Sequence, residues 1–237
     1  MKEAVKADPA LMRECIDKFI PNADGEAKEK FVRFYEMLID WNNRMNLTAI
    51  TEPADIAMKH FADSLTASEL IPMQAACIDI GTGAGFPGIP LKIMRPDIKL
   101  TLFDSLNKRI VFLNEVLSEL DIQAETVHMR AEDGGRNVKF REKFDVALTR
   151  AVANTNVLCE WTLPFVKKGG VSIMYKGPKA ADETEKAGRA LKELNADASV
   201  KTFLTDWGER NLIIVRKNGS TPKKYPRKAG TAEKEPL

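Results

Sequence analysis

Four closely spaced glycines near the middle of the chain constrain its fold more than any other feature. They stand at positions 81, 83, 85 and 88 of the stretch Cys77-Ile-Asp-Ile-Gly-Thr-Gly-Ala-Gly-Phe-Pro-Gly-Ile-Pro-Leu91. An apolar run ends just before them and an apolar helical pattern resumes just after them, which is typical of a buried parallel strand, a tight turn and a helix. Glycine is needed where the backbone turns with positive φ or approaches a ligand closely. Because open α/β sheets bind cofactors at such strand ends, we expect a cofactor at this turn.

Two cofactors can be compared on the same stretch. From Gly83 it contains the pattern G-x-G-x-x-G, and Asp104 follows about twenty residues later, as in dinucleotide-binding proteins. Pro87 and Pro90 argue against a pyrophosphate, because they lack N–H donors where the helix would bind phosphate. The carboxylate of Asp79 would repel a pyrophosphate as well. S-adenosylmethionine, a zwitterionic sulfonium without phosphate, tolerates both features, and Asp104 would then accept hydrogen bonds from its ribose. A glycine turn that binds no ligand is the remaining alternative.

The composition agrees with one main α/β domain that carries smaller appendages. The chain has 237 residues, of which 44% are hydrophobic, enough for a sizeable core. Three scattered cysteines and two histidines predict neither a disulfide framework nor a metal site, which favours a reducing, cytoplasmic compartment. The N-terminus has no apolar signal core and no apolar run reaches membrane-spanning length, so we expect no membrane contact.

Basic residues gather near the end of the chain. The net charge is only +2, yet residues 216–228 contain six Lys and Arg residues and no Asp or Glu. Such a cluster is the footprint of a polyanionic partner, which a whole-chain sum conceals. A solvated tail explains the pattern equally well. We therefore divide the chain into a helical N-terminal region (1–70), a cofactor-binding domain (71–217) and a basic, flexible tail (218–237).

The hydrophobic pattern predicts helices up to residue 70 and alternating strands and helices afterwards. The first two helices end near Ile20 and Asn42, and Thr51 is expected to cap a third helix that carries His60. A lone histidine there is more often half-buried and structural than catalytic. The alternation predicts seven strands, at 76–80, 100–103, 125–129, 144–148, 171–175, 199–203 and 212–216, with helices at 89–94, 108–120, 158–166 and 182–194 and a turn at Gly169-Gly170. The sheet is expected to be mostly parallel, with the last strand antiparallel to its neighbour because the link between the last two is short.

Charged residues follow several of these strands at their carboxyl ends, where ligands bind in open α/β sheets. They are Asp79, Asp104, Arg130 to Glu132, Arg150 and Lys176. Arg130, Arg150 and Lys176 are cationic, and cations around a cofactor cleft suit an anionic substrate such as a nucleic-acid backbone. Simple solvation of strand-end charges is the alternative, but three cations in register favour a function.

Together these residues resemble the GidB/RsmG family of bacterial 16S ribosomal RNA (guanine-N7) methyltransferases. The stretch 79–91 carries most of the resemblance, because its Gly-Phe-Pro-Gly form is far more specific than a generic glycine loop. Matching positions run nearly end to end: Trp41-Asn42, Asn46-Leu-Thr48, His60, Asp63-Ser-Leu65, Asp104-Ser105, Lys108-Arg109, Arg130-Ala-Glu132, Thr149-Arg-Ala151, Lys176-Gly177 and Tyr225-Pro-Arg-Lys-Ala-Gly-Thr231. The acidic end, residues 232–237, departs from the family's pattern.

The resemblance implies a Rossmann-like class I methyltransferase fold with a helical N-terminal extension. It also implies S-adenosylmethionine as cofactor and 16S ribosomal RNA, or the small ribosomal subunit, as partner of a cytoplasmic protein that we expect to be a monomer. By resemblance the cofactor site is lined by Gly81, Phe86, Ala131, Glu132 and Arg150, to which the turn and the next strand end add Gly83, Gly85, Asp104 and Ser105. Positioning residues expected near the RNA are Arg130, Arg150 and Lys176, and the tail adds Lys223, Lys224, Arg227 and Lys228.

The implied chemistry needs no general base, because guanine N7 carries a lone pair and no proton. It needs the methyl group and N7 held in line, which is a gain of proximity and orientation. The target base must also leave its stack to reach the pocket. Two other functions stay open from the residues: an NAD(P)-binding oxidoreductase, favoured by G-x-G-x-x-G, and a non-catalytic RNA-binding assembly factor.

Overall fold

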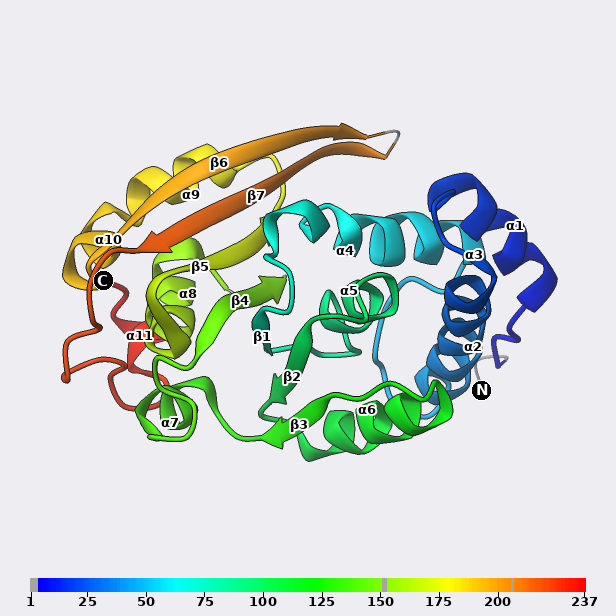
Figure 1. Cartoon of the computed structure of the whole chain (residues 1–237), viewed down its shortest axis with the longest axis horizontal. Helices are drawn as coiled ribbons and strands as arrows, with labels where there is room; N and C mark the ends of the chain where they lie inside the picture. Colours follow the sequence, from blue (N-terminus) through cyan, green and yellow to red (C-terminus); the bar gives the residue numbers. More distant parts are fainter. Residues whose placement is uncertain (1–3, 151–152, 206) are drawn as a thin grey trace.

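A seven-stranded sheet forms the centre of the protein (Figure 1). The structure, a computed structural model, describes residues 4–150, 153–205 and 207–237. The strands are β1 (Ala76–Ile80), β2 (Lys99–Asp104), β3 (Glu125–His128), β4 (Phe144–Arg150), β5 (Val166–Lys176), β6 (Ala196–Thr205) and β7 (Gly208–Lys217). Their order is β3-β2-β1-β4-β5-β7-β6; β1 to β5 run parallel, and β7 is antiparallel to both of its neighbours. The predicted fold class is confirmed.

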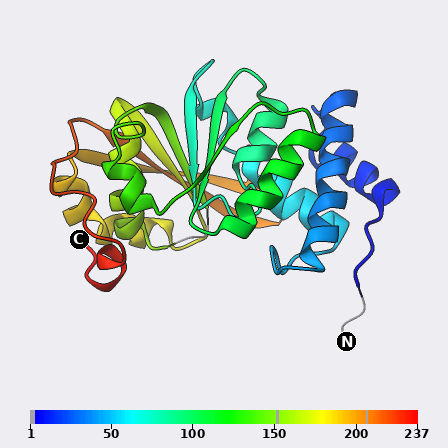
Figure 2. The same ribbon diagram turned by 90° about the horizontal axis from the view of Figure 1, so that it is seen from below.

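Helices cover both faces of this sheet (Figures 1 and 2). The N-terminal helices are α1 (Pro9–Phe19), α2 (Gly25–Asn42), α3 (Pro53–Ile56), the π-helical η1 (Ala57–Ala62), α4 (Asp63–Leu65) and the 3-10 turn η2 (Ser68–Leu70). Those that follow are α5 (Gly88–Met94), α6 (Asn107–Glu119), α7 (Ala131–Arg136), α8 (Thr155–Thr162), the 3-10 turn η3 (Leu163–Phe165), α9 (Ala180–Lys186), α10 (Gly188–Glu193) and α11 (Thr231–Lys234). The N-terminal helices, α5 and α6 share one apolar cluster, whereas α8, α10 and the C-terminal segment share another.

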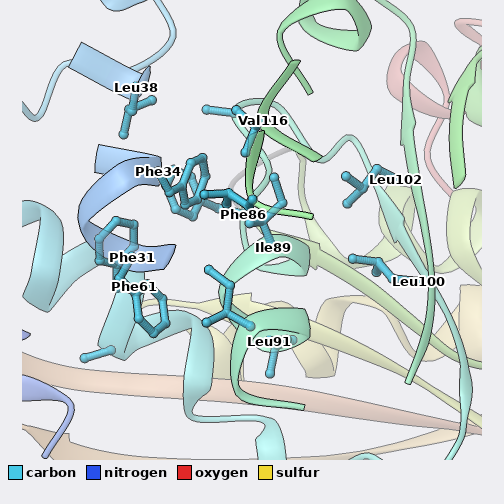
Figure 3. Packing of buried hydrophobic residues seen from close by; sticks show 14 of the residues in the cluster. Phe31, Phe34, Leu38, Phe61, Phe86, Ile89, Leu91, Leu100, Leu102 and Val116 are labelled. Carbon is cyan, nitrogen blue, oxygen red and sulfur yellow. The ribbon is translucent and has the colours of Figure 1, made fainter. Parts of the chain in front are cut away.

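The N-terminal helices are joined to the sheet by aromatic packing (Figure 3). Phe31 and Phe34 of α2 contact Phe61 of η1 and Phe86 of the glycine turn; the ring centroids are 4.9 Å apart for Phe31 and Phe61 and 5.3 Å for Phe34 and Phe86. All four side chains are buried. The turn after β1 is therefore built partly on residues of the N-terminal helices. The division of the chain at residues 70 and 217 stays a prediction.

The expectations for the end of α8 and the start of β5 are wrong in two respects. The helix predicted to reach residue 166 ends at Thr162, and a 3-10 turn leads directly into the strand. The predicted turn at Gly169-Gly170 lies inside β5, where the register with β4 shifts. Gly169 has a φ of 85°, and a Cβ on Gly170 would lie 2.6 Å from the carbonyl oxygen of Asp145. The two glycines therefore permit an irregular strand rather than a turn.

Two helix boundaries also differ from the prediction. The helix after β5 is interrupted at Ala187, where α9 ends and α10 begins. The third helix is preceded by Glu52 rather than capped by Thr51, and its first residue is Pro53, whose missing N–H is tolerated at that position. These differences leave the order of the elements unchanged.

The last two strands form a long hairpin that extends over α4 toward α1 (Figure 1). Trp207, next to its tip, packs edge-on against Phe19 of α1 with 6.4 Å between the ring centroids. The buried hydroxyl of Tyr175 in β5 donates to the carbonyl oxygen of Ser64 in α4 at 2.6 Å. The segment 57–65 is thereby held beside the ends of β4 and β5.

Candidate functional site

The glycine turn after β1 requires glycine for two different reasons. Gly81, Gly83 and Gly85 have φ angles of 69°, 60° and 92°, which disfavour a side chain. Gly88 is required for space, because a Cβ there would lie 2.8 Å from Oδ2 of Asp79. The expected positive φ is confirmed at three of the four glycines, whereas the expected close approach to a ligand stays a prediction, because Gly88 lies against Asp79.

Asp79 anchors this turn from within the sheet. Its fully buried carboxylate accepts hydrogen bonds through Oδ2 from the N–H of Gly88 at 2.9 Å and from the hydroxyl of Thr82 at 2.7 Å. No partner for Oδ1 is found in the described parts of the chain. Burial raises the pKa of this carboxyl to about 7.

The first turn of α5 presents no free N–H group to a phosphate. Pro87 and Pro90 have no N–H, and the N–H of Gly88 is bonded to Asp79. The N–H groups of residues 89 and 91 are bonded to the carbonyl groups of residues 85 and 87. Because pyrophosphate sites depend on such donors, the geometry supports the argument made from the sequence against a dinucleotide.

Three cavities lie side by side at the carboxyl ends of the strands. The first, of 230 Å³, is lined by Arg130, Ala131 and Glu132 among others. The second, of 390 Å³, is lined by Thr48, His60, Gly83, Phe86 and Arg150 among others; the third, of 170 Å³, by Asp63, Arg150, Lys176 and Arg210 among others. The first and second cavities share Gly81, Asp104 and Ser105, and the second and third share Arg150. The three cavities therefore form one row from the end of β3 to the start of β7.

Most of the predicted cofactor residues line the first two cavities. Gly85 is the exception, because it does not face either of them. A larger cavity, of 430 Å³, lies elsewhere, between the start of α2 and the C-terminal ends of α5 and α6. Among the described residues, no group of three or more His, Cys, Asp and Glu side chains could hold a metal ion. In the same part of the chain, none of the helices has the length and apolar character that crossing a membrane requires.

Asp104, at the end of β2, holds the glycine turn against the neighbouring strand. Its buried carboxylate accepts from the N–H of Gly83 at 2.9 Å, from the N–H of Leu106 at 2.9 Å and from the guanidinium of Arg109 at 3.2 Å. A carboxylate offers about four acceptor positions, so one is left for a ligand in the adjoining cavities. The proposed bond to a ribose stays a prediction.

Arg150, at the end of β4, joins the second cavity to the third. Its Nη1 donates to the carbonyl oxygen of Lys59 at 3.1 Å and to Oδ2 of Asp63 at 3.2 Å, and its Nη2 donates to Nδ1 of His60 at 3.3 Å. The guanidinium carbon lies 4.9 Å from the ring centroid of Phe86. The imidazole of His60 is stacked on the same phenyl ring, with 4.7 Å between the centroids. Sequence reasoning named Arg150, His60 and Asp63 separately but did not predict that His60 and Asp63 contact its guanidinium.

His60 is held as the neutral imidazole. Because an arginine can only donate, Nδ1 accepts and the proton is assigned to Nε2, which donates to the hydroxyl of Thr48 at 2.8 Å. Burial, assisted by the charge of Arg150, lowers the pKa of His60 to about 4. His60 therefore acts as a structural partner of Arg150, in agreement with the expectation that it is half-buried.

We expect acidification to destabilise the protein through His60. The folded chain lowers the pKa of this group from 6.5 to about 4, so the unfolded chain binds the proton more readily. The contribution of the neutral His60 to the free energy of unfolding is present above pH 6.5 and falls as the pH drops toward 4. At pH 5 this contribution is lower by about 2 kcal/mol. Urea unfolding of His60→Gln and His128→Gln at pH 7 and pH 5 measures this. Only His60→Gln should reduce the difference between the free energies of unfolding at pH 7 and pH 5. An equal difference in both variants would contradict the lowered pKa of His60.

Lys176 and Arg130 occupy different surroundings, although both were predicted near the RNA. Lys176 is largely buried: its Nζ donates to the carbonyl oxygen of Ala153 at 2.6 Å and lies 2.7 Å from Oε2 of Glu183. Arg130 is exposed at the mouth of the first cavity. Arg130 is therefore the more exposed of the two cations, and the RNA contact of both stays a prediction. Ala151, part of the predicted Thr149-Arg-Ala151 motif, lies outside the described residues.

The C-terminal segment packs against the domain and completes the first cavity. Gly230 donates its N–H to Oε1 of the buried Glu132 at 2.9 Å, and Glu233 lines the cavity. Arg227 forms an ion pair with Glu160 at 2.6 Å, and its predicted contact with RNA stays a prediction. The other three predicted tail residues, Lys223, Lys224 and Lys228, are exposed, and Lys224 pairs with Glu193 at the surface.

The fold and the site together define a class of protein. A parallel sheet with one antiparallel strand, a glycine turn after β1 and an acidic residue ending β2 are the features of class I S-adenosylmethionine-dependent methyltransferases. The O-methyltransferase TomG of Streptomyces achromogenes, solved in complex with SAM, has a TM-score of 0.55 and 16% identity over 86% of this chain and 96% of its own. A precorrin-6y C5,15-methyltransferase of Geobacter metallireducens has a TM-score of 0.51 and 14% identity over 73% and 92%.

Sequence comparison identifies the family. The GidB model, described as rRNA small subunit methyltransferase G, matches residues 27–213. The ribosomal RNA small subunit methyltransferase G of Desulforamulus reducens is 48% identical over 87% of this chain and 89% of its own length. Its counterpart in Clostridium perfringens is 45% identical over 96% and 98%. The chain belongs to this family, which confirms the predicted resemblance and, with it, an S-adenosylmethionine-dependent methyltransferase.

Proposed function

We propose that the protein transfers a methyl group from S-adenosylmethionine to N7 of one guanine in 16S ribosomal RNA. The observation that carries this proposal is the row of three cavities, with Arg150 between the second and the third. A methyltransferase needs a donor pocket and an acceptor pocket that meet at one point. The names of the relatives support ribosomal RNA of the small subunit as substrate. Guanine N7 as the acceptor follows from the resemblance to the family.

The residues around the first two cavities fit this cofactor. The first cavity offers Ser105, Ala131 and Glu132 to an adenosine, and the second offers the open glycine turn to an amino-acid chain. A cationic ligand above the turn would favour the ionised form of Asp79, whose pKa burial raises to about 7. When bound, S-adenosylmethionine supplies an electrophilic methyl group on a positively charged sulfur.

The side chains of the site position substrates and are not arranged to move protons. His60 is held neutral and its ring nitrogens are both engaged, one with Thr48 and one with Arg150. The guanidinium of Arg150 offers only donors and cannot act as a general base. A lone pair on guanine N7 needs no base, so an arrangement that only orients the reactants is sufficient.

Methyl transfer to ribosomal subunits tests the proposed function directly. Labelled S-adenosylmethionine is incubated with the protein and small subunits from a strain that lacks it, and the product is mapped by N7-sensitive cleavage. Incorporation at a single guanine is the expected result. Cofactor binding by calorimetry without incorporation into subunits or free 16S RNA would favour the assembly-factor alternative. Saturable binding of a nicotinamide cofactor would support the oxidoreductase instead.

Exposed lysines of the C-terminal segment are proposed to contact the RNA backbone. We expect the double substitution Lys223→Ala, Lys228→Ala to weaken RNA binding without changing stability, because both side chains are solvent-exposed. The slope of log K against log salt concentration should fall by about one for each lost phosphate contact. Fluorescence anisotropy with 16S RNA measures the slope, and Lys18→Ala in α1, at the opposite end of the molecule (Figure 1), is the control. An unchanged slope would remove the segment from the RNA interface.

A cytoplasmic location and a monomeric state are part of the same proposal. Both were expected from the sequence, and the location agrees with that of ribosomal RNA in bacteria. Light scattering coupled to size-exclusion chromatography would measure the oligomeric state.

A further inference from the structure

We propose that the third cavity holds the target guanine and that Asp63 recognises the Watson–Crick edge of this base. The inference rests on the proposed function, which assigns N7 as the acceptor but leaves open what binds the base. The cavity of 170 Å³ lies between α4, the ends of β4 and β5 and the start of β7. It adjoins the proposed methyl-donor cavity at Arg150, and its volume suits one planar base.

Asp63 is the one carboxylate among the described residues that line this cavity. Its side chain is 9% exposed and forms two ion pairs, from Oδ2 to Arg150 Nη1 and from Oδ1 to Arg210 Nε, both at 3.2 Å. Charge-assisted hydrogen bonds are usually about 2.7–2.9 Å long, and a carboxylate has about four acceptor positions. Asp63 is therefore a buried, charged acceptor whose capacity is only half used, at the wall of a cavity.

Guanine is the nucleobase that a carboxylate can recognise in this way. Its Watson–Crick edge places the donors N1–H and N2–H₂ side by side, so that two carboxylate oxygens can accept from both. Adenine has an unprotonated N1 at the same place, whose lone pair a carboxylate repels. Guanine N7 lies on a different edge of the purine. A base bound to Asp63 through its Watson–Crick edge therefore leaves N7 free.

The other walls of the cavity suit the remaining parts of the base. Tyr175 and Leu212 are buried and supply apolar surface for a ring face. Arg150 and Lys176 add cationic donors to the lining, which suit the acceptor O6. Arg210 of β7, with 30% of its side chain exposed, also lines the cavity.

The charge of Asp63 also matches the change in charge during the reaction. The N7 lone pair forms a bond to the methyl carbon while the carbon–sulfur bond breaks, and the electron pair of that bond remains on sulfur. One positive charge thus passes from sulfur to the purine, which makes N1–H a stronger donor. A carboxylate that accepts from N1–H stabilises the transition state more than the ground state. Asp63 would therefore contribute to rate as well as to selectivity.

Asp63→Asn tests this inference in the intact protein. It should lower kcat/KM for unmodified small subunits by about 10²-fold, because one bidentate base contact is lost. Cofactor affinity, measured by calorimetry, should stay within about threefold, since Asp63 does not line the first two cavities. The matched control is Asp55→Asn, which removes a surface ion pair with Lys59 on the same helical segment and should leave the rate unchanged.

Changes to the base provide the more specific readout. With the mapped guanine replaced by inosine, which lacks only the N2 amino group, the unaltered protein should lose about tenfold in kcat/KM. With adenine at the mapped position, kcat/KM of the wild-type protein should be lower than with guanine by about 10³-fold or more. In Asp63→Asn this preference for guanine over adenine should be smaller by a factor of about ten or more. Equal rates on guanine and inosine, wild-type activity of Asp63→Asn, or loss of cofactor binding in that variant would each overturn the assignment. Absence of any transfer by the wild-type protein would instead refute the proposed function.

Discussion

Replacing Arg150 by alanine is expected to lower kcat/KM for the RNA substrate by about 10³-fold. The guanidinium links three groups: the carbonyl oxygen of Lys59, the carboxylate of Asp63 and the imidazole of His60. It also covers Phe86 at the glycine turn. Removing the guanidinium deletes a fixed positive charge between the second and third cavities, the proposed methyl-donor and guanine sites, and frees the side chains that it holds. Loss of one preorganised charge costs about 10²–10³ in rate, and misplacement of the reactants adds to this loss.

Arg150→Lys separates charge from geometry. A lysine keeps the positive charge, but its single ammonium cannot reach the three partners at once, so we expect it to recover less than about a tenth of the lost activity. Single-turnover methyl transfer at saturating cofactor measures the chemical step, and calorimetry measures cofactor affinity separately. Arg44→Ala, which removes an exposed ion pair with Asp40, is the control. Wild-type activity in Arg150→Lys would show that charge alone matters and that the network is incidental.

Local patterns were sufficient to predict the order of the elements and the glycine turn. The strand that ends at Ile80, the turn and α5 are determined by residues adjacent in sequence, through apolar periodicity and the need for positive φ at Gly81, Gly83 and Gly85. The short link between β6 and β7 likewise predicted an antiparallel pair. The predicted turn at Gly169-Gly170 was wrong because a tertiary contact determines the backbone conformation there. Gly170 lies against the carbonyl group of Asp145 in the neighbouring strand.

The partners of the functional side chains were beyond such reasoning. Arg150 meets His60 and Asp63, about ninety residues earlier in the chain, only because the N-terminal helices pack beside the ends of β4 and β5. A strand-end position predicted that Arg150 is functional but carried no information on which carboxylate would face it. The match of His60 and Asp63 to the family pattern was the one available signal, and it did not show that the two side chains converge on one guanidinium.

The basic tail shows that charges counted along the sequence do not reveal which of them are paired in the fold. From residues 216–228 alone, six cations without an acid indicate either an RNA contact or a solvated tail. In the fold the six differ: Lys217 is fully buried and pairs with Glu142, Arg227 pairs with Glu160, and Lys223 and Lys228 are exposed. The acids that neutralise the first two lie 67 to 75 residues away, so charge counted along a short window overestimates what remains for RNA.

Arg227→Ala is expected to lower the free energy of unfolding by about 3–5 kcal/mol, because it leaves a buried carboxylate without its cationic partner and, among the described residues, with only the backbone N–H of residue 227 as donor. Glu160 is 1% exposed, and it accepts from the N–H, Nε and Nη2 of Arg227 at 2.6 to 3.0 Å. Lys224→Ala is the matched control, since its ion pair with Glu193 is exposed and contributes about 0–1 kcal/mol. Urea unfolding measures both. The double substitution Glu160→Leu, Arg227→Met should restore much of the loss, because an apolar pair of similar size avoids the unpaired charge. If Arg227→Ala unfolds at the wild-type urea midpoint but binds RNA weakly, Arg227 contacts RNA and its ion pair does not stabilise the fold. The C-terminal segment would then have no structural role through this pair.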